Sequence, residues 1–135
     1  MTTLADAVAA TGVRVHEHLD PAAEVPRISR AAAQGDVLVL RVNGPVAVEP
    51  MRKAVAVVRS AVTTHAHTLH PCGPCAWEAH TPASASDVLL GVLTVFGGST
   101  AVLIHQEHGA LEVLPGTYQV RRQREFAGVW RPVTD

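Results

Sequence analysis

Short apolar runs separated by turn residues divide most of this chain into predicted β-strands. Residues 37–42 are almost wholly apolar and lie between turn signals, which is typical of a strand buried on both faces. Residues 54–62 are rich in valine, a β-branched residue that favours strand over helix. The predicted strands are residues 37–42, 54–62, 88–96, 100–105, 111–114 and 117–126.

Tight turns separate the last four of these strands. Gly97-Gly98-Ser99, His108-Gly109 and Pro115-Gly116 are each typical of a chain reversal. Consecutive strands joined by such turns predict an antiparallel meander. With the two earlier strands, the pattern predicts a mainly β protein, built as a small antiparallel β-barrel or sandwich of six to eight strands.

The N-terminal segment, residues 1–30, differs from the β-rich body in residues 31–135, which we expect to be a single domain. Residues 1–10 predict a short amphipathic helix, and the proline-containing segment that follows predicts an irregular arm. Within the body, residues 71–87 contain three prolines and two cysteines. This composition predicts a long loop, and long loops inside compact domains are often functional.

Composition and charge exclude several classes of protein. Hydrophobic residues make up 47% of the chain and charged residues 17%, which indicates a globular protein. The formal net charge of −1 provides no general attraction for nucleic acid. The sequence has no recognisable secretion signal and no apolar run near the roughly 18 residues of a membrane span. We therefore expect a cytoplasmic protein that contacts no membrane.

Five of the eight histidines fall in two short clusters, residues 64–70 and 104–109. His65 and His67 share one face of a strand, because side chains alternate with a period of two. On a second strand, His105 and Glu107 form another matched pair. If these strands are neighbours, about 4.8 Å apart, four nitrogen or oxygen donors converge.

Such a donor set predicts a site for a divalent transition metal, with zinc preferred. His65, His67 and His105 are the predicted primary ligands, and His108 or Glu107 is the fourth. Glu107 is also a candidate general base, or a partner that orients a ligating histidine. The alternative is that these histidines are ordinary polar residues on a strand rim. The pair His16 and His18 is a further candidate in a less regular setting.

A second possible metal site combines the Cys72-Gly-Pro-Cys75 motif with flanking histidines. His70 and His80 could complete a Cys2His2 zinc site with Cys72 and Cys75. The alternatives are a proline-stiffened loop with incidental thiols and a redox dithiol. A thioredoxin-like dithiol normally opens a helix in a βαβ unit, and the pattern predicts no such unit.

The segment from His105 to Phe126 resembles a pattern found in small uncharacterised bacterial proteins, H-x-E-H-x-x-L-x-L-x-x-G-x-Y-x-V-x-x-Q-R-E-Y. Those proteins also have a Q-G-D-V-L start, matched from Gln34, and a G-H-x-H motif, in which Thr64 here replaces the glycine. The resemblance implies that both histidine clusters belong to one fold. His-x-His with a downstream histidine is also similar to cupins, which are metal-binding β-barrels, although the glutamate that follows in cupins is missing.

Two functional hypotheses follow from these patterns. The first is a metal-binding β-barrel protein, with the possibility of a metalloenzyme that uses a histidine-coordinated metal. The second is a non-catalytic, oligomeric binding or assembly module with the histidines at its rim. Several strands are apolar on both faces, which predicts a homo-oligomer. Its further partner, a small molecule or a protein, is not specified by the sequence.

Overall fold

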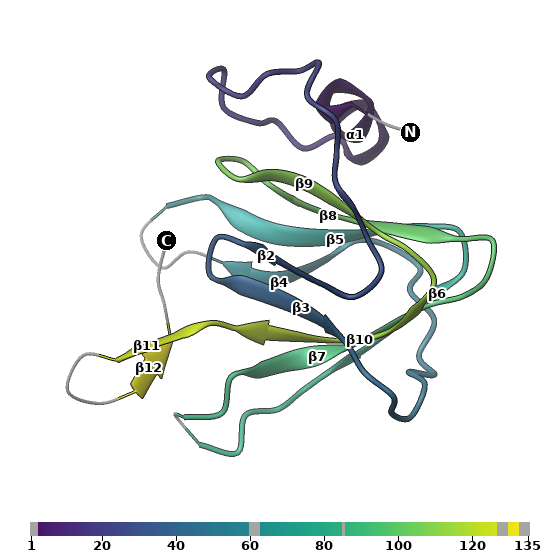
Figure 1. The fold of residues 1–135 in the computed structure, drawn as a ribbon, viewed down its shortest axis with the longest axis vertical. Coiled ribbons are helices and arrows are strands. Elements are labelled where there is room, and N and C mark those ends of the chain that lie inside the picture. Colours follow the sequence, from purple (N-terminus) through teal and green to yellow (C-terminus); the bar gives the residue numbers. More distant parts are fainter. Residues whose placement is uncertain (1–2, 60–62, 85, 127–129, 133–135) are drawn as a thin grey trace.

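The protein folds as a β-sandwich with one short N-terminal helix, as Figure 1 shows for the computed structural model. The structure describes residues 3–59, 63–84, 86–126 and 130–132. Two five-stranded sheets pack against each other, and a separate two-stranded pair follows. The predicted mainly β class is confirmed. The sheets are stacked and not closed into a barrel, and the described residues contain more than the six to eight expected strands.

The first sheet has the strand order β1-β9-β8-β5-β4, and the second has the order β2-β3-β10-β7-β6. The first comprises β1 (Arg27–Ile28), β4 (Val55–Arg59), β5 (Ala66–Cys72), β8 (Thr100–His105) and β9 (Gly109–Val113). The second comprises β2 (Ala31–Gln34), β3 (Val37–Arg41), β6 (Cys75–Ala79), β7 (Leu89–Val95) and β10 (Gly116–Arg122). The separate pair is β11 (Arg124–Phe126) with β12 (Trp130–Pro132). Residues 60–62 of the predicted strand 54–62 lie outside the described residues.

Three long segments turn corners and contribute a strand to each sheet. One ladder runs from Cys72 opposite Thr100 to Cys75 opposite Val95, so β5 and β6 follow β8 and β7 around the bend. Glycines with positive φ lie at these corners: Gly73 at 105°, Gly98 at 82° and Gly116 at 151°. Strands that change sheets through such bends are typical of sandwiches with corners.

The predicted meander of four hairpin-connected strands is therefore wrong in its connections. Gly97-Gly98-Ser99 bends a strand between sheets, and β7 pairs with β10 and β6 instead of with β8. Of the predicted reversals, the turn at residues 106–108 does join a hairpin, β8 with β9. Turn residues specify where the backbone bends, but the hydrogen-bond partner of each strand depends on distant segments.

The predicted loop at residues 71–87 is also corrected. Pro71 and Cys72 end β5, and residues 75–79 form β6, which pairs with β7 along its length. The described residues of this region that lie outside strands are the corner at Gly73-Pro74 and residues 80–84 and 86–88. Prolines and glycine made this segment resemble a loop in the sequence, because a corner between two sheets requires the same residue types as a loop does.

The main core lies between the two sheets and is built from their inward-facing side chains. Val37, Leu93 and Tyr118 are each 0% exposed. The Tyr118 hydroxyl donates a hydrogen bond to the carbonyl of Leu114 at 2.7 Å, which satisfies the polar end of this buried ring. Aliphatic residues make up most of the rest of this core, as the composition predicts.

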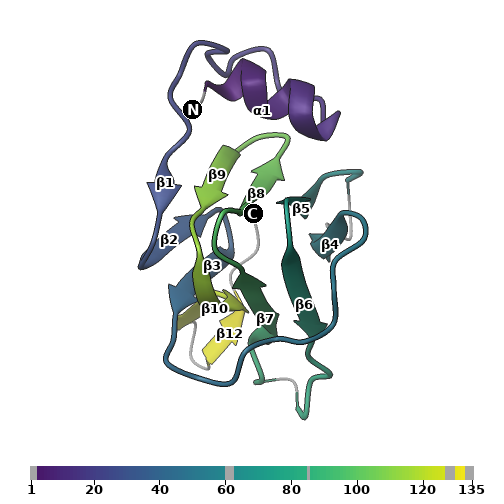
Figure 2. The same ribbon diagram turned by 90° about the vertical axis from the view of Figure 1, so that its right-hand side faces the viewer.

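The predicted N-terminal helix is present as α1 (Leu4–Thr11), and it covers the outer face of the first sheet. Figures 1 and 2 show α1 and the following loop at one end of the molecule, next to β8 and β9. A second small apolar cluster joins the two parts: Leu4, Ala7, Val25, Val102, Ile104 and Ala110. The arm thus lies beside the end of the sandwich where β5 begins and β8 ends. None of the described helices has the length and apolarity that crossing a membrane requires.

Candidate functional site

His67 and His105 lie side by side on neighbouring strands, as strand parity predicts. β5 and β8 are antiparallel, with Thr68 opposite Ile104, so the next pair along the ladder is His67 and His105. Their ring centroids are 4.3 Å apart, and the two residues are only 2% and 5% exposed. The two predicted histidine clusters therefore meet inside one end of the sandwich.

Six of the eight histidines form one continuous group of ring contacts, which we call the histidine cluster. Its members are His16, His18, His65, His67, His105 and His108. His65 is central, because its ring centroid lies 4.9 Å from that of His16 and 5.7 Å from that of His105. The arm thus adds histidines to the predicted four. The sequence offered His16 only as a weaker candidate, since its irregular setting gave no strand parity to place it.

At the outer part of the cluster, His65 lies between a second imidazole and a carboxylate. Its Nε2 is 3.2 Å from Nε2 of His16, and its Nδ1 is 3.0 Å from Oε1 of Glu107. Ligand atoms of these three residues lie within 4.8 Å of one another. A carboxylate next to Nδ1 favours a proton there, which leaves the lone pair of a neutral His65 on Nε2, facing His16.

Gln106 fixes this outer geometry through backbone contacts. Its carbonyl accepts a hydrogen bond from the backbone N–H of His16 at 2.8 Å. Its side-chain Oε1 accepts one from the backbone N–H of Ala66 at 3.1 Å. One residue of the β8–β9 turn thus holds both histidine-bearing segments in place.

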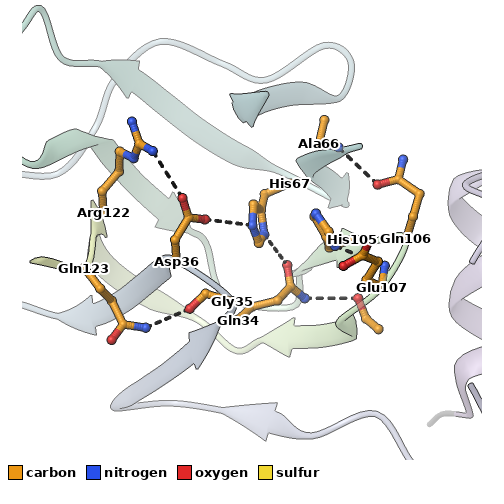
Figure 3. A network of polar contacts seen from close by, with 11 residues as sticks. Gln34, Gly35, Asp36, Ala66, His67, His105, Gln106, Glu107, Arg122 and Gln123 are labelled. Atoms are coloured by element: carbon orange, nitrogen blue, oxygen red, sulfur yellow. Dashed lines mark hydrogen bonds and ion pairs between the residues drawn. The ribbon is translucent and has the colours of Figure 1, made fainter. Parts of the chain in front are cut away.

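Behind the outer part, His67 is held in a buried polar network (Figure 3). The amide nitrogen of Gln34 donates to the carbonyls of Leu103 and Gly109 at 3.0 and 3.1 Å. Its oxygen therefore faces Nδ1 of His67 at 3.0 Å and accepts a hydrogen bond from the N–H there. Oδ1 of Asp36 lies 3.0 Å from Nε2 of the same ring, and the other oxygen of Asp36 lies 3.3 Å from Nη2 of Arg122.

This arrangement places an oxygen acceptor next to each ring nitrogen of His67. One ring nitrogen donates to an amide oxygen, and a lone pair on the other would face a carboxylate only 3.0 Å away. Gln34 and Asp36 were expected to form only the turn before the first body strand. Two polar residues just before an almost wholly apolar strand were the available signal, and both are in fact buried, at 3% and 2% exposure.

The structure places the four predicted metal ligands in one cluster, but with different surroundings. His65 belongs to the outer group with His16 and Glu107. Both ring nitrogens of His67 contact protein groups. Nδ1 of His105 accepts a hydrogen bond from the backbone N–H of Glu107 at 3.0 Å. His108 is exposed, with its ring centroid 4.6 Å from that of His105. Metal ligation by His67, His105 or His108 stays a prediction, and for the first two it requires these contacts to rearrange.

The residues of the second predicted site have separate environments. Cys72 is exposed at the end of β5, whereas Cys75 is buried in the core and its thiol donates to the carbonyl of Thr100 at 3.5 Å. Burial raises the pKa of the Cys75 thiol and lowers the pKa of His70. The raised pKa disfavours metal binding by Cys75 at neutral pH, because the thiolate is the ligand form. The lowered pKa of His70 instead favours its neutral, metal-binding form. Among the described residues, these four side chains form no group of convergent ligand atoms.

His80 instead contacts Asp87, seven residues further along the chain, and this contact yields a testable prediction. Nε2 of His80 lies 2.6 Å from Oδ2 of Asp87, and this hydrogen bond, with those from the Ala83 and Leu89 backbones, lowers the pKa of Asp87 to about 2. A lowered pKa stabilises the fold above the ordinary value of 3.8, and that contribution is lost as the pH falls through about 2. We expect carboxyl NMR titration to find this low pKa, and His80→Ala to return it toward 3.8. An unchanged pKa in the variant would contradict the assigned cause.

Comparison with known families adds one match. A family model described as Domain of unknown function (DUF8820) matches residues 33–123, which is more than half of the chain. The chain belongs to this family. The matched DUF8820 segment contains the buried network and His65, while His16 and α1 precede it. Searches of the curated proteins and of the solved structures found no match.

Proposed function

We propose that this protein binds a divalent transition metal, with zinc preferred, between His16 and His65. The distance between their two Nε2 atoms, 3.2 Å, is the observation that supports this most. Two nitrogens bound to one zinc at 2.0–2.1 Å with tetrahedral angles lie about 3.3 Å apart. The two side chains thus already have the spacing of a bound pair.

Glu107 supports this proposal from behind the His65 ring. A carboxylate that accepts the distal N–H of a ligating histidine fixes its tautomer and makes it a stronger donor. Glu107 Oε1 lies 3.0 Å from Nδ1, the nitrogen opposite the proposed metal. Two ligands leave further tetrahedral positions for another side chain or for water, whose pKa zinc lowers toward about 7. A hydrolytic role with such a water is the form of enzyme that this site favours.

Calorimetric titration of untagged, chelator-treated protein with zinc tests the proposal. We expect saturable binding of one zinc ion per chain, reversed by a chelator. Elemental analysis after dialysis should give the same stoichiometry. Absence of saturable binding in both measurements would overturn the proposal.

Glu107→Gln is expected to weaken zinc binding by about 10–100-fold, the usual effect of removing a group that hydrogen-bonds a metal ligand. Glutamine keeps the length of the side chain but removes the negative charge next to Nδ1 of His65. Glu17→Gln is the matched control, because this exposed glutamate lies on the arm outside the proposed ligand group. Equal affinities of the two variants would contradict the role given to Glu107.

The alternative function is an oligomeric assembly module. It rests on strands that are apolar on both faces, and β8 is such a strand. Its outward-facing Val102 and Ile104 pack against Leu4 and Ala7 of α1, so this surface is covered within one chain. Homo-oligomerisation therefore stays a prediction, to be tested by light scattering.

A further inference from the structure

We infer that metal binding holds the N-terminal arm, defined here as residues 3–25 and including α1, against the sandwich. This inference rests on the proposed function, because the metal would join His16 of the arm to His65 of the sandwich. Metal-free protein would release the arm more readily, and bound metal would hold it in place.

The arm is organised largely by its own contacts. Thr3 and Asp6 form a capping box at the start of α1, and Gly12 ends the helix with a left-handed backbone conformation. The returning chain is bonded to the helix, since the carbonyls of Pro21 and Ala23 accept hydrogen bonds from Ala5 and Leu4, each at 2.9 Å. The arm can therefore move as a unit without losing these internal hydrogen bonds.

Attachment of the arm to the sandwich is mostly apolar. Leu4, Ala7 and Val25 meet β8 and β9 in the small apolar cluster, and further partly buried arm residues pack against it: Val8, Val13, Val15 and Leu19. Two hydrogen bonds join His16 of the arm to the sandwich, one from its backbone to Gln106 and one between its ring and His65. His16 thus adds polar contacts to a mainly apolar attachment.

A metal ion would strengthen the contact between the rings of His16 and His65. Without metal, His16 and His65 share a single N–H between their Nε2 atoms, which is one hydrogen bond in a half-buried position. With metal, the Nε2 lone pairs of His16 and His65 would bind one ion. This pair of ligands would be lost when the arm undocks. A ligand at 100 times its dissociation constant shifts the equilibrium toward the binding-competent form by about 100-fold.

Docking also determines what solvent can reach. The side chain of His65, which contacts His16 of the arm, is only 20% exposed. Release would uncover this imidazole together with Val102 and Ile104 on the outer face of β8. Metal concentration would therefore control access to His65 and to an apolar patch.

Hydrogen–deuterium exchange of the full-length protein, with zinc or with a chelator, tests this inference. We expect zinc to slow exchange of the His16 backbone amide, which donates to the Gln106 carbonyl only while the arm is docked, by at least 10-fold, while β3 and β10 change little. His16→Ala should abolish the slowing, and Glu17→Gln, the matched control in the same segment, should retain it. Circular dichroism would verify that both variants fold.

The outcomes separate this inference from the proposed function. If calorimetry shows zinc binding but exchange in the arm is unchanged, or changes equally in His16→Ala, metal-dependent docking of the arm is overturned and the metal site stands. If zinc does not bind at all, both fall. An increase in fluorescence of an apolar dye on chelation, absent in the zinc-bound protein, would independently support release of the arm.

Discussion

Asp36→Ala is expected to lower the free energy of unfolding by about 3–5 kcal/mol, the usual cost of removing one partner from a buried ion pair. Asp36 is 2% exposed and lies 3.0 Å from the equally buried His67. Its other oxygen contacts Arg122 at 3.3 Å, so the substitution leaves the guanidinium of Arg122 and the ring of His67 without their common carboxylate. Urea unfolding followed by circular dichroism would measure the change. Because domains are stable by only about 5–15 kcal/mol, the loss would be conspicuous.

Two further variants show whether charge causes this loss. Asp36→Asn keeps the shape and one hydrogen-bond acceptor but removes the charge, so we expect a smaller destabilisation of about 1.5–3 kcal/mol. Asp20→Ala removes an exposed carboxylate that accepts a single backbone N–H from Ala22, and it should cost about 1 kcal/mol or less. If Asp36→Ala proved no more harmful than Asp20→Ala, the buried network would contribute nothing particular to stability.

His65→Ala is expected to weaken zinc binding by more than about 100-fold. Removing a group behind a ligand already costs 10–100-fold, and this substitution removes a proposed ligand itself. It also separates Glu107 from the site, because Nδ1 of His65 is the atom that this carboxylate contacts. Calorimetry with the metal-free variant would measure the affinity.

His70→Ala is the matched control for this experiment. His70 lies on the same strand as His67, but its Nε2 contacts the hydroxyl of Thr68 at 2.9 Å and it is outside the histidine cluster. We expect this variant to bind zinc as the wild type does. If both variants bound zinc equally well, the metal would be held elsewhere, and the set of His67, His105 and His108 would be the next to test.

Local patterns predicted several of the β-strands but missed β2 and β6, because apolar runs and turn residues act over only a few positions. The expected strands at residues 37–42, 88–96 and 100–105 correspond to β3, β7 and β8. The short N-terminal helix is also where its apolar spacing placed it. Strand parity, with the assumption that the two strands are neighbours, brought His67 next to His105, which the 4.3 Å ring distance confirms.

Site composition was predicted less completely, since the contacts that decide it come from distant segments. His65 and Glu107 were expected to be near each other, and they are. His16 was weak in the sequence because nothing local indicates that α1 packs on β8 and directs the arm toward His65. The burial of Asp36 could not be predicted from local sequence either, because a polar residue in a turn is usually exposed.

By itself, therefore, the sequence determined where the chain is extended, where it bends and which side chains share a face. Those properties follow from backbone alternation and turn geometry, which are local. Only the tertiary structure decided that Gly98 turns a corner between sheets, that Gln34 and Asp36 enclose His67, and that the arm delivers His16 to His65. These depend on which distant segments pack together, and that choice is made by burial of the whole core and not by any single stretch of chain.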